Sequence, residues 1–233
     1  GKILVGSAGN QGDKKIHVNK TLSLTNRLLS FVNFPNSPNG LPNPTISKGE
    51  TLIDIWGEVG KNFEVAVNVF NISTNTYVNW TPYINTSTNS STYSGVVYDN
   101  DITSTQDGCI VQIATENSNS NNSKPHATIY IDNNYQDDIS NRLLIEVKGI
   151  NGSVNAWHYG IDGTARFSDL LYLLPSITAG SVLGATDGNT DITVGEIGGT
   201  GNSIISVGAF TSKNSFTNFS GNSPTIDYPG SLG

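Results

Sequence analysis

A loop of small residues directly follows the first strand-like segment of the chain. Residues 2–8 read KILVGSA, an apolar run typical of a buried strand, and residues 7–10 read Ser-Ala-Gly-Asn. Three of these four residues have almost no side chain, and the fourth, Asn10, carries an amide that donates hydrogen bonds. This combination favours a place where another molecule approaches the backbone closely and is contacted by Asn10.

Histidine and cysteine side chains are the other candidates for nucleophilic or acid-base chemistry, and the chain has three histidines, at His17, His126 and His158. His17 follows the opening loop, but a packed or surface histidine is the more common role. His158 follows a tryptophan in a strand-like segment and is expected to pack there. The single Cys109 begins an alternating apolar run, which favours a buried thiol. We therefore expect no hydrolytic activity from this chain alone.

One acidic stretch has the spacing of a calcium loop. Asp187, Asn189 and Asp191 stand at positions i, i+2 and i+4, as the first ligands of such a loop do, and their oxygens suit Ca²⁺. The glycine usual at the sixth position is replaced by Ile192, and the twelfth residue is Gly198. A hairpin turn at the Asp-Gly pair is therefore the favoured interpretation, with calcium as the alternative, and no other cofactor is expected.

Composition excludes two classes of partner. The formal charge is −7 with only 12 Lys and Arg in 233 residues, whereas nucleic-acid affinity depends on clustered basic side chains. No apolar run approaches the roughly 20 residues that span a bilayer. Charged residues make up only 13%, and Asn, Ser and Thr are abundant, which indicates many strands joined by polar turns.

Short strands separated by turns occupy most of the sequence. Residues 52–56 place Leu, Asp and Trp on one face and two Ile on the other, and residues 63–69 alternate in the same way. Further strands are expected at 76–84, 92–99, 108–116, 126–133, 141–150 and 152–160. This spacing is typical of an antiparallel β-sandwich or jelly roll. Residues 166–175 could form a short helix or an irregular apolar segment.

The two ends of the chain have a different pattern. Residues 202–210, NSIISVGAF, form a continuous apolar run like residues 2–8, and such runs are typical of strands in a parallel sheet. The simplest account is one domain inserted into another. We expect a mainly β chain with parts of an α/β core at 1–19 and 173–233 and an inserted sandwich at 20–172.

The opening "ILVGSAGNQG" resembles the strand and loop of subtilisin-like serine peptidases that carry the oxyanion-hole asparagine. "NSIISVGAFTSKNSFTNFSG" is similar to the next core strand of that family. Ordinary subtilisins have only a short segment between these motifs, whereas here most of the chain separates them. A large β insertion at this point is similar to the jelly-roll insert of the Csp-type subtilases of clostridia.

The resemblance implies a role for each matching residue. Asn10 matches the asparagine that donates to the oxyanion, and Ser7, Ala8 and Gly9 match the small residues that wall the primary specificity pocket. The catalytic Asp and His of the family precede this strand, and its Ser follows in a Gly-Thr-Ser turn; no such motifs occur here. We expect a non-catalytic interior portion of a bacterial peptidase that is extracellular or on the cell surface. Its partners would be the rest of that peptidase and a peptide or protein substrate.

Two alternatives stay open at this point. A free-standing carbohydrate-binding or adhesion sandwich could use Trp56, Trp80 and Trp157 as stacking platforms, although aromatic residues of β-proteins more often lie in the core. The chain could also belong to a degenerate, inactive subtilase. The flanking subtilase-like motifs argue against a free-standing module, which has no reason to carry them.

Overall fold

The chain forms two compact units, of which one is a β-sandwich. The computed structural model describes residues 4–7, 15–33, 49–71, 74–88, 91–98, 108–133, 141–160, 166–168, 184–190 and 204–207. The first unit comprises residues 15–189, and the second comprises residues 1–14 with 190–233. Within the described stretches there is no helix long and apolar enough to cross a membrane.

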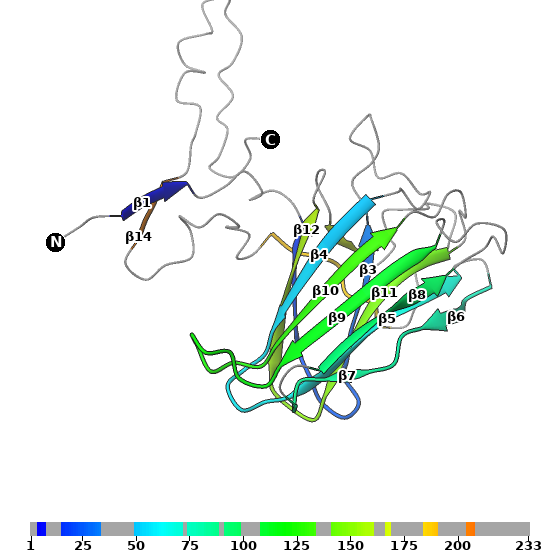
Figure 1. The fold of residues 1–233 in the computed structure, drawn as a ribbon, viewed down its shortest axis with the longest axis horizontal. Helices are drawn as coiled ribbons and strands as arrows, with labels where there is room; N and C mark the ends of the chain where they lie inside the picture. Colours follow the sequence, from blue (N-terminus) through cyan, green and yellow to red (C-terminus); the bar gives the residue numbers. More distant parts are fainter. Residues whose placement is uncertain are drawn as a thin grey trace, which may run out of the picture. The chain divides into compact units, whose positions relative to one another are not determined.

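One face of the sandwich is an antiparallel sheet with the strand order β2-β12-β4-β10-β9-β8 (Figure 1). Its strands are β2 (His17–Thr21), β4 (Gly49–Trp56), β8 (Ser91–Tyr98), β9 (Cys109–Glu116), β10 (His126–Asn133) and β12 (Ser153–Gly160). We call it the first sheet. Isoleucines of β4 and β10 point inward from its centre, and polar or aromatic residues alternate with them on the outer side.

The opposite face has the order β13-β3-β11-β5-β6, with β7 also paired to β5; we call it the second sheet. Its strands are β3 (Leu28–Asn33), β5 (Phe63–Asn71), β6 (Thr76–Trp80), β7 (Ile84–Asn85), β11 (Asn141–Gly149) and β13 (Arg166–Ser168). Together the two antiparallel sheets confirm the predicted sandwich. The strand β13 shows that the run beginning at Arg166 starts as a strand rather than a helix.

The core lies between the two sheets. Ile53, Ile55 and Ile129 from the first sheet and Val65 and Val67 from the second are fully buried in one apolar cluster. Each buried side chain of this size contributes about 1.5–3 kcal/mol relative to an exposed one. The alternation predicted for residues 52–56 and 63–69 therefore describes the inward faces of β4 and β5 correctly.

Two threonines, one after β6 and one after β7, hydrogen-bond to the backbone of β5. Thr81 donates its backbone N–H to the carbonyl of Val67 at 2.9 Å and accepts the Val67 N–H on its hydroxyl at 3.0 Å. Thr86 makes the same pair of bonds with Phe63. Each threonine satisfies two backbone groups of β5, so the connection between β6 and β7 has a defined path.

The segment 184–190 crosses from one sheet to the other. Its Thr186 N–H donates to Leu29 of the second sheet at 2.7 Å, and its Asn189 N–H donates to His17 of the first sheet at 2.7 Å. Gly188 lies between these anchors, where a Cβ would come within 2.4 Å of the Lys15 carbonyl oxygen. The expected Asp-Gly hairpin is replaced by an extended connection with a bridge at each end.

The second unit contains one described strand pair. The strands β1 (Leu4–Ser7) and β14 (Ile204–Val207) are parallel and in register from Leu4 opposite Ile204 to Ser7 opposite Val207. The prediction that the two apolar runs are strands of a parallel sheet is therefore confirmed. The pair joins segments from opposite ends of the sequence.

Candidate functional site

Ser7, the first residue of the predicted oxyanion loop, ends strand β1 opposite Val207. Ala8, Gly9 and Asn10 follow it and lie outside the described residues. A small-residue loop at the carboxyl end of a parallel strand has the position that ligands occupy in α/β sheets. The roles assigned to these four residues stay predictions.

The predicted calcium residues engage neighbouring side chains of the sandwich. Asp187 forms an ion pair with Lys15, and Asn189 Oδ1 lies 2.7 Å from His17 Nδ1. Asp191 lies outside the described residues. In the described part of the chain, no three His, Cys, Asp or Glu side chains are grouped to hold a metal. Asp187 and Asn189 thus attach the crossing segment to Lys15 and to His17 of β2, and calcium binding stays a prediction.

His17 is a buried histidine of the first sheet. Its Nε2 lies 3.1 Å from Asn155 Oδ1, and its ring lies 4.9 Å from the Trp157 ring, centre to centre. With Asn189 on the other nitrogen, both ring nitrogens have an amide oxygen as neighbour. Of the two ordinary roles expected for His17, packed or on the surface, the structure shows the packed one.

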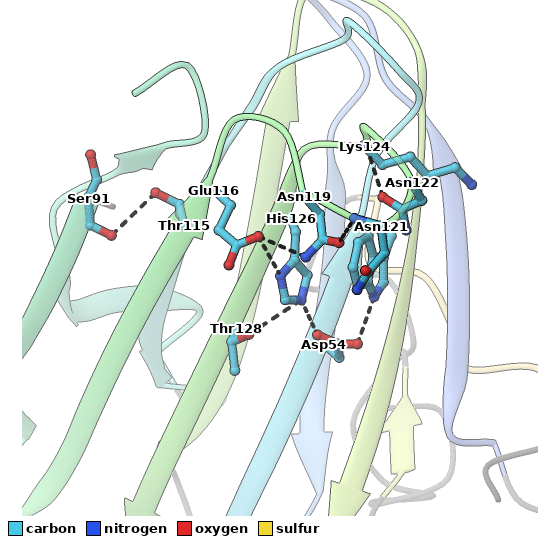
Figure 2. A network of polar contacts seen from close by, with 11 residues as sticks. Asp54, Ser91, Thr115, Glu116, Asn119, Asn121, Asn122, Lys124, His126 and Thr128 are labelled. Carbon is cyan, nitrogen blue, oxygen red and sulfur yellow. Dashed lines mark hydrogen bonds and ion pairs between the residues drawn. The ribbon is translucent and has the colours of Figure 1, made fainter. Parts of the chain in front are cut away.

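His126 lies in a polar network on the outer face of the first sheet (Figure 2). Its ring stacks on Trp56 with 3.9 Å between ring centres, and its Nε2 contacts Asp54. The Trp56 indole donates to the other Asp54 oxygen at 2.7 Å. Glu116 Oε2 lies 4.0 Å from His126 Nδ1. Two carboxylates and one aromatic ring thereby hold the imidazole in place.

A hydroxyl also lies near this histidine but is not activated by it. Thr128 Oγ1 is 3.4 Å from His126 Nε2, the same nitrogen that makes the shorter contact to Asp54. A general base needs a free nitrogen facing the nucleophile while the acid holds the other nitrogen. Because both groups share Nε2, the network favours a structural or binding role over nucleophilic catalysis.

Two further candidates from the sequence lie in the interior. His158 is fully buried beside Phe167, with 5.2 Å between ring centres, and burial lowers its pKa to about 3 while the Arg166 backbone opposes the shift. Burial also raises the pKa of Cys109 to about 12, and Asp132 adds to this shift. Both residues are core groups, as the sequence predicted.

A cavity on the outer face of the second sheet gathers polar and aromatic side chains that the sequence did not single out together. Its floor holds Glu146 of β11, which is 3% exposed. Arg27 Nη1 donates to Glu146 Oε1 at 2.5 Å, and Asn68 Nδ2 donates to Oε2 at 2.9 Å. Both carboxylate oxygens are therefore occupied, and the arginine neutralises the buried charge.

Three exposed aromatic residues form the wall of the same cavity. Trp80 is 58% exposed and lies directly opposite Asn68 in the strand pair β5–β6. Tyr77 and Tyr83 are 40% and 38% exposed. Burial raises the pKa of Tyr83, and the adjacent Glu146 raises it further, so the hydroxyl stays protonated. The cavity volume is about 250 Å³. We call this site the Trp80 cavity.

The tryptophans named in the sequence thus have two different environments. Trp56 and Trp157 lie on the outer face of the first sheet, each against a histidine, and Trp80 borders the cavity on the second sheet. Asn68 and Glu146 were recognisable only as polar residues within otherwise apolar strands. A buried polar residue in such a strand is informative because it requires partners.

Comparison with known proteins identifies a structural relative. No family model matches the chain, and no curated protein matches it. Among solved structures, the CspB protease of Clostridium perfringens matches with a TM-score of 0.56 and 17% sequence identity. The match covers 97% of this chain and 36% of the protease chain, so this sequence spans about a third of the relative's length. The chain is similar in fold to one portion of that larger protease.

Proposed function

We propose that this chain is an interior portion of a Csp-type subtilisin-like serine endopeptidase. The observation that carries the proposal is the parallel pairing of β1 with β14, two strands that belong to the two subtilase-like motifs of the sequence and are separated in the chain by the sandwich. The fold similarity to one portion of the CspB protease supports the same assignment.

In this proposal Asn10 supplies one hydrogen-bond donor to the tetrahedral oxyanion, and Ser7, Ala8 and Gly9 border the primary specificity pocket. The catalytic Asp, His and Ser belong to other parts of the parent protein. Removal of one oxyanion donor in subtilisin lowers kcat by about 10²–10³-fold. The variant Asn10→Ala in the parent peptidase should lower kcat by a similar factor and leave KM nearly unchanged.

The chain alone should not react with a serine-directed fluorophosphonate probe. The parent peptidase should react, and the labelled serine should lie outside these 233 residues. Labelling of a particular serine within the chain would contradict the proposal. A parent protein that fails to label but binds peptide would instead indicate a degenerate subtilase.

The sandwich is proposed to brace the peptidase or to shape access to its substrate cleft, outside the bacterial cell or on its surface. Replacing residues 15–189 of the parent protein by a short linker separates the two roles. If the sandwich braces the peptidase, its removal should lower the midpoint of thermal unfolding by a large amount. If it restricts access to the cleft, its removal should leave kcat/KM for a short peptide unchanged and raise kcat/KM for a folded protein substrate.

A further inference from the structure

We propose that the Trp80 cavity binds a single pyranose ring of a glycan. This inference does not depend on the peptidase proposal, because it rests only on side chains of the sandwich. The cavity of about 250 Å³ lies just below the range of about 300–1,000 Å³ usual for small-molecule sites, so one ring fits and a longer chain must extend outward.

The aromatic wall suits the apolar face of a sugar ring. The C–H groups on one face of a pyranose pack against aromatic surfaces, and Trp80 offers the largest exposed ring at the cavity. Tyr77 is held edge-on to Phe70, with 5.2 Å between ring centres and planes at 78°. Because Tyr77 is held in this way, it loses little conformational entropy when a ligand binds.

The polar floor suits hydroxyl groups. Asn68 uses its Nδ2 on Glu146, and its Oδ1 is hydrogen-bonded by no residue in the described part of the chain. Arg27 lines the cavity, gives one N–H to Glu146 and has half of its side chain exposed, so it has further N–H donors to offer a ligand. Asn68 and Arg27 bond the same carboxylate and line the same cavity, so sugar hydroxyls can donate to the first and accept from the second.

Other ligand classes fit less well. A cation would meet Arg27, and the ammonium of Lys148 already lies 3.4 Å from the centre of the Tyr83 ring. An anion gains little either, because Arg27 is already paired with the Glu146 carboxylate. An apolar side chain would cover Asn68 Oδ1 and the guanidinium without giving them partners, which costs about 1–3 kcal/mol for each buried group. A neutral polyhydroxylated ring satisfies both the aromatic wall and the polar floor.

The test uses the full chain and saturation-transfer NMR with methyl α- and β-glycosides of glucose, galactose, mannose and N-acetylglucosamine. At least one glycoside should receive saturation at millimolar concentration. Trp80→Ala should weaken its binding by about tenfold or more, since truncation of a central tryptophan has effects of this size. Trp80→Phe should retain part of the binding.

Val78→Ala is the matched control, because Val78 lies on the same strand, is 44% exposed and does not line the cavity. It should bind as the wild type does. Tetrahydropyran, which has the ring without hydroxyls, should bind far more weakly than the glycoside. The proposal is overturned if no glycoside receives saturation, if Trp80→Ala and Val78→Ala bind equally, or if tetrahydropyran or tetramethylammonium binds as well as the glycosides.

Discussion

His158 should make the sandwich lose stability in mild acid. Its imidazole is fully buried, and neither ring nitrogen makes a hydrogen bond of normal geometry with a described residue. Burial lowers its pKa to about 3 in the folded protein, against an ordinary value of 6.5. The unfolded chain therefore binds a proton below pH 6.5 that the folded chain does not bind.

The size of the effect follows from these two pKa values. Each pH unit between them corresponds to about 1.4 kcal/mol, so lowering the pH from about 7.5 to about 5 removes about 2 kcal/mol from the free energy of unfolding. The loss begins as the pH falls through 6.5 and continues toward 3. In a domain with a stability of about 5–15 kcal/mol this is a large change.

Urea unfolding of the wild type and of His158→Leu at both pH values isolates this histidine, because all other titratable groups are shared. The wild type should lose about 2 kcal/mol more than the variant over this pH interval, with the same denaturant dependence m. At pH 7.5 the variant should be about as stable as the wild type, because it removes a buried polar ring whose nitrogens make no hydrogen bond of normal geometry with the described residues. Equal losses in both proteins would refute the assignment of a buried, neutral His158.

Three further outcomes follow from contacts in the sandwich. Gly188→Ala places a Cβ 2.4 Å from the Lys15 carbonyl oxygen and should lower the free energy of unfolding by about 1–3 kcal/mol; unchanged urea unfolding would contradict this close approach. Thr81→Val removes the acceptor of the Val67 N–H and should cost about 1–3 kcal/mol, whereas Thr81→Ser should be nearly neutral; equal losses would show that the hydroxyl is not the important group. Cys109 is 2% exposed with a raised pKa, so Ellman's reagent should react with it only in denaturant, and rapid reaction of the native protein would place the thiol elsewhere.

Strand positions were predictable because side-chain alternation is a local property of the backbone. In β4, Ile53 and Ile55 alternate with Asp54 and Trp56, and a strand places such neighbours on opposite faces whatever its partners are. The apolar runs at the two ends were similarly recognisable as strands of a parallel sheet. Local pattern also identified Cys109 as a core residue.

The Trp80 cavity could not be predicted in this way. Arg27 and Glu146 are 119 positions apart, and Asn68 meets Trp80 only through the register of β5 and β6. A shift of one residue in either strand would turn these side chains to the other face. The sequence by itself determined which segments become strands, because period-two alternation needs no partner. Only the tertiary structure decided which polar side chains share a site, because pairing and register depend on packing between distant segments.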